Sequence, residues 1–409
     1  MAEEIVLQKI EKAEKPYEVI EIKGSGHPDS LSDELAEELS VAYSRYTKEH
    51  FGAILHHNFD KVGILGGEAR IEFGSGRMTK PIRVLVNGRA SSQFGDEKIP
   101  LQEIVRGQTF NFFKRKFLML SENDVEMHYN FSYSSSPGKT DIKAEKEGTR
   151  KHWFAPRSKD DLKELKFLGS NDTSLGAGYA PQTELEHAAL ALESHLSSEE
   201  THRQHPWLGT DIKIMAVRNG NEIDITMCVP QICLHVKSSE EYQANMEKAR
   251  EIITAFLKQK LPGKNISLFL NTRDDYQTGE LYLTFTGSSI ENGDEGLVGR
   301  GNRTNGMIAV TKPWSMEGAS GKNPVYHVGK IYNLAAQELA ESIQRKTGGY
   351  VETYLISQSG KLLTRPWKAI IGMTEDFGNK EEMTQFILKE LDKIPSITER
   401  ILEQKYRLH

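Results

Sequence analysis

The segment from Gly293 to Lys330 is unusually rich in glycine, with residues at 293, 296, 299, 301, 306, 318, 321 and 329. This density excludes a packed helix or a central strand, because glycine weakens both and instead permits positive φ and close approach of backbone N–H groups. The segment also holds five Lys or Arg, among them Arg300, Arg303 and Lys322, against three Asp or Glu. We expect most of these cations to lack a neutralising side chain. Backbone donors beside fixed cations predict an anion site, and a polyphosphate suits it.

This segment is not a P-loop. That motif, G-x-x-x-x-G-K-[ST], needs a glycine five residues before Gly321, where Met316 stands, and a hydroxyl residue after the lysine, where Asn323 stands. Taken alone, the segment is also compatible with a glycine-rich surface loop whose charges are solvated.

The composition is that of a globular chain, with 409 residues, 37% apolar and 27% charged. At about 100–200 residues per domain, two to four domains are expected. The charged first fifteen residues predict no secretory signal, and no apolar run approaches the ~20 residues of a membrane helix, so we expect a cytoplasmic protein. An isoelectric point near 6.2 argues against general nucleic-acid binding. Cys228 and Cys233 are expected to be buried, reduced thiols.

A second informative feature is the motif GSGHPDS at 24–30, which follows a predicted strand over Tyr17–Lys23. A long helical pattern begins after it and stops at Gly52. Proline suits the first helical position, so His27 and Asp29 are predicted at a helix N-terminus. Asp29 could simply complement the helix dipole, worth ~0.3–1 kcal/mol. A carboxylate at such a helix start also suits Mg²⁺ bound together with phosphate.

The remaining pattern predicts an α+β fold. Residues 53–73 are expected to form paired strands that turn at Gly66-Gly67, and Asp172 to precede a glycine turn. The order strand, helix, hairpin, helix occurs about three times, which suggests three similar mixed-sheet domains in a pseudo-threefold arrangement, with helices on one face of each sheet. We expect domains at 1–130, 171–275 and 276–409, with a mobile loop region at 131–170.

The longer helices are predicted from their apolar periodicity. Their expected ranges are 101–120, 182–196, 239–260, 325–346 and 380–391.

Seven short motifs together resemble the S-adenosylmethionine synthetase (methionine adenosyltransferase) family, in its archaeal-type branch. They are GHPDS at 26–30, HHNFDK at 56–61, GGE at 66–68, NDTSLGAGYAP at 171–181, GTDIK at 209–213, GDEGLVGRGNR at 293–303 and ASGKNP at 319–324. Each is weak alone, but all seven keep the family's order over most of the chain.

The resemblance implies a reaction between ATP and L-methionine. The methionine sulfur would attack C5′ of the ribose, and the tripolyphosphate would leave and be hydrolysed to pyrophosphate and phosphate. A thioether needs no general base, so the chemical difficulty lies in the charge that the leaving group gains. The resemblance also implies Mg²⁺, K⁺ as a candidate second cation, and a homodimer with active sites between subunits.

Site residues follow from the same resemblance. His27 would lie near the leaving oxygen, Arg300 and Lys322 would bind the phosphates, and Asp29 would hold Mg²⁺. Further contacts to ATP or methionine are implied for Glu68, Asp172, Asp211, Lys213, Asp294, Ser320, Gly321 and Lys330. Glu68 could instead be a turn residue, and Asp211 and Lys213 could be surface charges on a strand.

The chain also departs from the better-known bacterial and eukaryotic branch. Ser30 and Tyr326 stand where that branch has lysines, and Lys330 is a candidate replacement for the second. No Asp or Glu lies between Glu317 and Glu338, where that branch has a metal-binding aspartate, and FSYSSSPGK at 131–139 replaces a GxGSxDL segment. Two rival functions remain open: an ATP-dependent phosphotransferase with the same phosphate site, and a non-catalytic nucleotide sensor in which His27 only caps a helix.

Overall fold

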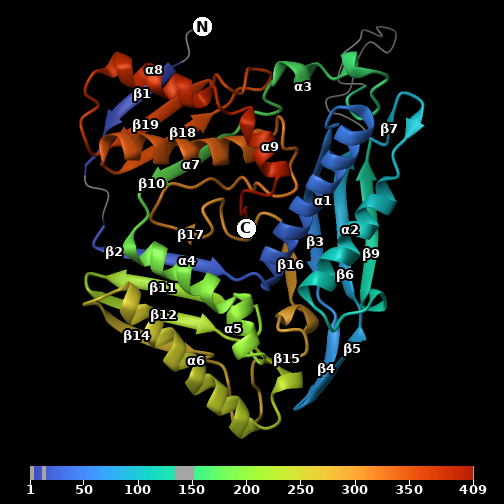
Figure 1. The fold of residues 1–409 in the computed structure, drawn as a ribbon, viewed down its shortest axis with the longest axis vertical. Helices are drawn as coiled ribbons and strands as arrows, with labels where there is room; N and C mark the ends of the chain where they lie inside the picture. The colour runs from blue at the N-terminus through green and yellow to red at the C-terminus, as the bar shows by residue number, and fades with distance from the viewer. Residues whose placement is uncertain (1–3, 12–14, 134–151, 409) are drawn as a thin grey trace.

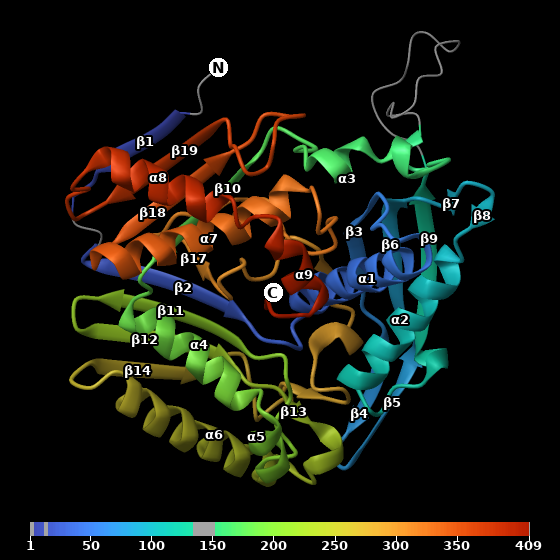
Figure 2. The same ribbon diagram turned by 45° about the horizontal axis from the view of Figure 1, so that its top comes forward.

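The structure, a computed structural model, describes residues 4–11, 15–133 and 152–408. In these ranges the chain forms three large mixed sheets, each covered on one face by a pair of helices (Figures 1 and 2). The predicted α+β class is confirmed. None of the helices within these ranges combines the length and apolar character needed to cross a bilayer. Of the predicted loop region 131–170, residues 134–151 lie outside the described ranges.

The N-terminal sheet is covered by α1 (Pro28–Phe51) and α2 (Leu101–Lys116), which contact each other. Its strands lie in the order β16 (Glu295–Leu297), β3 (His57–Leu65), β6 (Ile82–Ala90) and β9 (Val125–Ser132). Helix α1 begins at Pro28, as predicted, and ends at Gly52, which takes the left-handed conformation at φ 67°. Leu31, Leu35 and Leu39 are fully buried against the sheet, because residues four apart share a helix face.

The central sheet is covered by α4 (Glu184–Leu196) and α6 (Ser239–Lys260). Its strands lie in the order β14 (Asn265–Leu270), β12 (Glu222–Cys228), β11 (Lys213–Asn219), β2 (Tyr17–Lys23) and β17 (Ile308–Ala309).

The C-terminal sheet is covered by α7 (Val328–Thr347) and α8 (Lys380–Leu391). Its strands lie in the order β1 (Glu4–Lys9), β19 (Lys368–Met373), β18 (Val351–Ile356) and β10 (Leu175–Ala180). The smaller elements are β4 (Glu68–Glu72), β5 (Ser75–Lys80), β7 (Gln93–Phe94), β8 (Glu97–Lys98), β13 (Gln231–Ile232), β15 (Leu283–Thr284), α3 (Lys163–Phe167), α5 (Glu199–Gln204), α9 (Ser396–Leu402) and short 3-10 turns.

The three sheets share one pairing scheme. Each has a parallel pair at one edge, namely β6–β9, β12–β14 and β1–β19, and an antiparallel hairpin beside it. In addition, the strands that come before α1, α4 and α7 in the sequence pair into a sheet that another of these helices covers. Strand β2 precedes α1 but pairs with β11, and β10 precedes α4 but pairs with β18. The two strands before α7, β16 and β17, pair with β3 and β2. The sheets therefore do not coincide with the contiguous ranges 1–130, 171–275 and 276–409, which stay a proposal as domain boundaries.

Several local expectations need correction. Strand β3 pairs with β6, whereas β4 pairs with β5, so residues 53–73 do not form one hairpin. The glycines after Asp172 form strand β10 rather than a turn, because α7 packs directly on it: a Cβ at Gly176 would lie 2.1 Å from the Tyr332 carbonyl carbon. Cys233 is buried, but Cys228 is exposed, on the face of the central sheet that its helices leave uncovered.

Candidate active site

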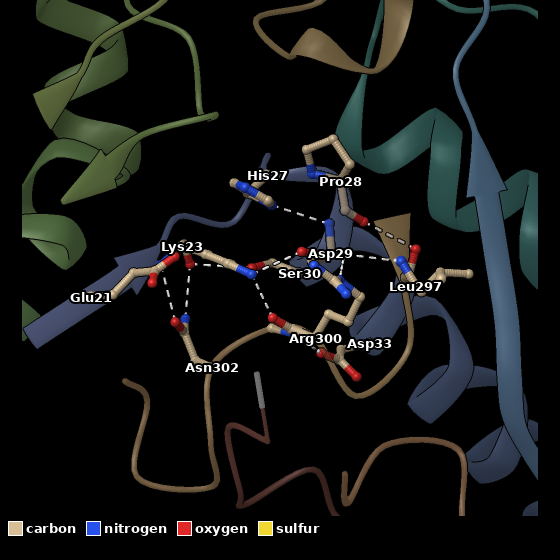
Figure 3. Close-up of polar contacts among 12 residues, drawn as sticks. Glu21, Lys23, His27, Pro28, Asp29, Ser30, Asp33, Leu297, Arg300 and Asn302 are labelled. Atoms are coloured by element: carbon tan, nitrogen blue, oxygen red, sulfur yellow. Dashed lines mark hydrogen bonds and ion pairs between the residues drawn. The ribbon is translucent and has the colours of Figure 1, made fainter. Parts of the chain in front are cut away.

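The start of α1 holds His27 beside the central sheet. Gly26 donates its N–H to the Thr210 carbonyl at 2.9 Å, and a Cβ at Gly26 would lie 2.3 Å from the Thr210 hydroxyl, so only glycine allows this approach. The His27 side chain caps the helix: its Nδ1 accepts the N–H of Asp29 at 3.1 Å (Figure 3). Burial lowers the pKa of His27, against the opposing effect of Asp211. The imidazole is therefore neutral near pH 7, and since Nδ1 accepts, its proton lies on Nε2.

Asp29 lies among cationic and backbone donors. Its Oδ2 accepts from Lys23 Nζ at 2.8 Å, and its Oδ1 accepts the Leu297 N–H at 3.0 Å. Arg300 Nε is 3.9 Å from Oδ1, and the Arg300 side chain is 69% exposed. Lys23, at the end of β2, also donates to the Arg300 carbonyl at 2.5 Å, and Asn302 bonds both backbone groups of Lys23 (Figure 3). Sequence reasoning missed Lys23, which directly precedes the GSGHPDS motif, and Asn302, which lies inside GDEGLVGRGNR but was given no role.

Asp211 and Asp294 form a pair of carboxylates that share the Ser289 hydroxyl. Buried Asp211 accepts from the Tyr282 hydroxyl at 2.8 Å and from the N–H and hydroxyl of Ser289 at 2.9 and 2.8 Å. The Ser289 hydroxyl also lies 2.9 Å from Asp294 Oδ2. Burial raises the pKa of Asp211, opposed first by His27 and then by the Ser289 hydrogen bonds. Lys213, at the start of β11, pairs with Glu21 at 3.1 Å.

The acidic face of α1 anchors the glycine-rich segment. Asp29, Asp33 and Glu37 are spaced four residues apart and so lie on one face. Asp29 accepts the N–H of Leu297, and Asp33 accepts those of Gly299 and Gly301 at 2.8 and 3.0 Å.

Further along this face, Glu37 accepts the Gly321 N–H at 3.0 Å. These backbone donors, which the sequence suggested as a phosphate cradle, are bonded to helix carboxylates instead. These hydrogen bonds hold the glycine-rich segment against α1.

Lys23 and Arg300 lie beside Asp29, and a second group of cations, Lys322 and Lys330, lies two turns further along α1 near Glu37. Lys330 is fully buried, and its Nζ donates to both Glu37 oxygens at 2.8 and 2.6 Å. Lys322 is 6% exposed and pairs with Glu317. The expectation that most of these cations lack a partner is therefore wrong for both lysines. At 1.5 Å rise per residue, the eight residues from Asp29 to Glu37 separate the two groups by about 12 Å along the helix.

The neighbours of Lys322 are also largely buried. Gly321 takes φ 75°, in the left-handed region, where its carbonyl accepts the Phe59 N–H at 2.7 Å. The Ser320 hydroxyl is buried without a hydrogen-bond partner among the described residues, and Ser320 lines a cavity of about 20 Å³, room for about one water.

Glu68 and Asp172 lie apart from both groups. Glu68 is exposed at the start of β4, where it pairs with Lys80 and forms a β-bridge to Asn292, two residues before Asp294. Asp172 is exposed ahead of β10, and its Oδ1 accepts the Thr173 N–H at 2.7 Å. In the described part of the chain, no side-chain hydrogen bond or ion pair joins Asp172 to His27 or Lys322.

The carboxylates of the site can be compared with the ligands that Mg²⁺ requires. Among the described residues, no three His, Cys, Asp or Glu side chains gather into a metal-binding group. Mg²⁺ is usually held by one or two carboxylates together with substrate phosphates, so such a cluster is not required. Asp29 and Asp294 each accept two hydrogen bonds and keep further lone pairs, but Asp29 is 6% exposed and paired with Lys23, whereas Asp294 is exposed. The carboxylates here fit a metal shared with a phosphate ligand.

Comparison with known proteins identifies the family of this chain. The sequence model of one family, described as S-adenosylmethionine synthetase (AdoMet synthetase), matches residues 3–405. The chain is 36% identical to an S-adenosylmethionine synthase of Pyrobaculum neutrophilum, over 99% of this chain and all of that protein. It is 37% identical to those of Pyrococcus furiosus, over 99% and 98%, and Aeropyrum pernix, over 94% and 93%.

A solved structure described as an unusual S-adenosylmethionine synthetase from Campylobacter jejuni has the same fold. It aligns with a TM-score of 0.59 and 14% sequence identity, covering 96% of this chain and 89% of that one. The family match over nearly the whole length and the full-length relatives above 30% identity lead to one conclusion: this chain belongs to the S-adenosylmethionine synthetase family.

Proposed function

We propose that this chain is a methionine adenosyltransferase, which forms S-adenosylmethionine from ATP and L-methionine by attack of the methionine sulfur on C5′ of ATP, with tripolyphosphate as the leaving group. Family membership supports the overall reaction. The subsequent hydrolysis of tripolyphosphate to pyrophosphate and phosphate belongs to the same proposal.

The observation that carries the mechanism is the state of His27. Its Nδ1 is occupied by the Asp29 N–H, and burial favours the neutral ring, so Nε2–H is a fixed donor at the start of α1. We assign it to the bridging oxygen between C5′ and the α-phosphate, where negative charge develops as the C–O bond breaks. The sulfur lone pair forms the new C–S bond and needs no base. A donor aimed at developing charge typically lowers the activation barrier by ~2.7–4 kcal/mol.

The remaining residues bind the leaving group in this proposal. Arg300 has an exposed guanidinium on a fixed turn, and Lys322 supplies a second cation from the buried group. Bound Mg²⁺, shared by Asp29 or Asp294 and the phosphates, would neutralise part of the tripolyphosphate charge. Buried Asp211 and Lys213, which pairs with Glu21, are assigned to the nucleotide. Glu68 and Asp172 are assigned to methionine or adenosine.

We further propose a homodimer whose active sites lie between subunits. The central sheet leaves one face uncovered, and Tyr17, Val217 and Phe269 expose 51%, 39% and 48% of their surface there. Lys213 and Glu21 lie on the same face, since side chains alternate along a strand. An exposed apolar face that continues into the site is suited to a second copy of the chain. Replacing Phe269 with aspartate should yield monomers in light scattering and reduce turnover, whereas an unchanged dimer would refute this interface.

One assay tests the reaction itself. The protein is incubated with ATP, Mg²⁺ and labelled methionine, and the products are separated. We expect a labelled sulfonium product together with pyrophosphate and phosphate. ADP as the nucleotide product would instead indicate a phosphotransferase, and no product would favour a nucleotide sensor. His27→Ala should reduce kcat by about 10²–10³ with little change in ATP affinity; unchanged turnover would remove His27 from the mechanism.

A further inference from the structure

We propose that Asp33 and Arg303 are positioning residues that hold the peptide groups on either side of Arg300 and thereby aim its guanidinium at the phosphates. We call this pair the Asp33–Arg303 clamp. The inference rests on the proposed function for what Arg300 contacts, but the clamp itself is a matter of contacts within this chain.

Asp33 holds the N–H groups that flank Arg300. Its Oδ1 accepts the Gly299 N–H at 2.8 Å, and its Oδ2 accepts the Gly301 N–H at 3.0 Å. The two carboxylate oxygens thus bracket one residue of the chain. Asp33 is 2% exposed, one turn of α1 beyond Asp29, so the bracket is built on a buried helix face (Figure 3).

Arg303 holds the carbonyl groups of the same two glycines. Its Nη2 donates to the Gly299 carbonyl and to the Gly301 carbonyl, both at 2.7 Å. Lys23 Nζ donates to the Arg300 carbonyl at 2.5 Å, and the Arg300 N–H donates to the Leu297 carbonyl at 3.2 Å. Every backbone polar group of residues 299–301 is therefore bonded.

The side chain of Arg300 contrasts with its backbone. It is 69% exposed, and its Nε lies 3.9 Å from Asp29 Oδ1. A fixed backbone beneath an exposed cation is the arrangement expected of a preorganised anion ligand, because the turn is already ordered before the substrate binds.

Sterics make this turn specific to glycine. Gly299 has φ 88°, in the left-handed region that favours glycine. A Cβ at Gly301 would lie 2.3 Å from Asp33 Oδ2, so any other residue there would displace the carboxylate that holds the Gly301 N–H. The glycines flanking Arg300 are thus explained by the clamp and not by contact with phosphate.

A double-mutant cycle tests whether Asp33 acts through Arg300. Asp33→Asn keeps the shape but removes one acceptor and the charge, and misplacement of about 1 Å can lower kcat by about 10². We expect Asp33→Asn to lower kcat by that amount when Arg300 is present. In the Arg300→Ala background, Asp33→Asn should change kcat by less than threefold. An equal loss in both backgrounds would overturn the proposal. Glu38→Gln, on the same helix and paired with Arg115, is the matched control and should leave kcat unchanged.

Trypsin cleavage after Arg300 tests the clamp without reference to activity. The native turn should resist cleavage, and Asp33→Asn should accelerate release of the fragment ending at Arg300 at least tenfold. Cleavage at other sites should not change, and Glu38→Gln, whose melting temperature is measured alongside, serves as the control variant. Arg303→Gln serves as the second variant if Asp33→Asn does not fold. Should Arg300→Ala leave turnover intact, the assigned role of Arg300 fails, while accelerated cleavage would still support the clamp. Unaccelerated cleavage in both variants would overturn it.

Discussion

Replacing Glu37 with glutamine should destabilise the protein far more than the same change at the adjacent Glu38. Glu37 is the partner of Lys330, which has no exposed surface, and its own side chain is 12% exposed. Glutamine can still accept the Gly321 N–H, but it leaves the Lys330 ammonium buried without a counter-charge. Glu38 is 13% exposed, but its partner Arg115 has a 51% exposed side chain, so that cation stays solvated when Glu38 is neutralised.

The expected size follows from these burials. Removing one partner of a buried ion pair costs about 3–5 kcal/mol, whereas an exposed pair contributes about 0–1 kcal/mol. An unfolding entropy of about 2.1 cal/mol/K per residue gives roughly 0.9 kcal/mol/K for 409 residues if the chain unfolds as one unit. Glu37→Gln should therefore lower the melting temperature by about 3–6 °C, and Glu38→Gln by about 1 °C or less.

Thermal unfolding by circular dichroism, with calorimetry as a check on cooperativity, measures both variants. Adding Lys330→Met to Glu37→Gln should restore most of the loss, because the stranded charge is gone. Burial already lowers the pKa of Lys330, so the unfolded chain binds more protons, and the deficit of Glu37→Gln should shrink as pH rises from 7 towards 10. A loss no larger than that of Glu38→Gln, or no recovery in the double variant, would refute the reasoning.

Two further predictions concern Asp33 and the packing of β10. Burial raises the pKa of Asp33 to about 6, and the charge of Asp29 raises it further. The hydrogen bonds from Gly299 and Gly301 and the charge of Arg303 lower this pKa, but by less than burial raises it. The folded state therefore holds this proton more tightly than the unfolded state, and Asp33 contributes stability that is lost as pH rises through 4 to 6. Denaturation melts of Asp33→Asn should lack that pH-dependent component, and an unchanged profile would contradict the assignment. Gly176→Ala should destabilise by more than about 2 kcal/mol because its Cβ meets the α7 backbone, whereas Gly107→Ala, in open space on α2, should stabilise by up to about 1 kcal/mol; calorimetry of both variants tests this, and equal effects would contradict it.

The sequence was sufficient for features that depend on neighbouring residues. Pro28 and Gly52 mark the ends of α1, and apolar periodicity predicted α6 and α8 with their observed bounds. His27 and Asp29 were expected at the helix start and lie there, because capping is a local interaction.

What depends on contacts between distant residues could not be predicted. The N–H groups of Gly299 and Gly301 are bonded to Asp33, some 266 residues away in sequence, and periodicity does not reveal such pairing. Lys330 was expected to face a phosphate, but its partner Glu37 lies on another helix. Glycine itself is ambiguous: at 176 it permits close packing of a strand on a helix, whereas at 299 it permits a left-handed turn.

The account depends most on the idea that Arg300 and Lys322 act on one bound triphosphate, within one chain or across a subunit boundary. Calorimetric titration of inorganic tripolyphosphate with Mg²⁺ tests it directly in the wild type, Arg300→Met, Lys322→Met and the control Lys258→Met, an exposed lysine on α6. One charge-assisted hydrogen bond contributes about 1.5–3 kcal/mol, or about 10–100-fold in Kd. We predict that both site variants weaken binding by at least tenfold while the control does not. Binding as tight as the wild type in either site variant would contradict the account.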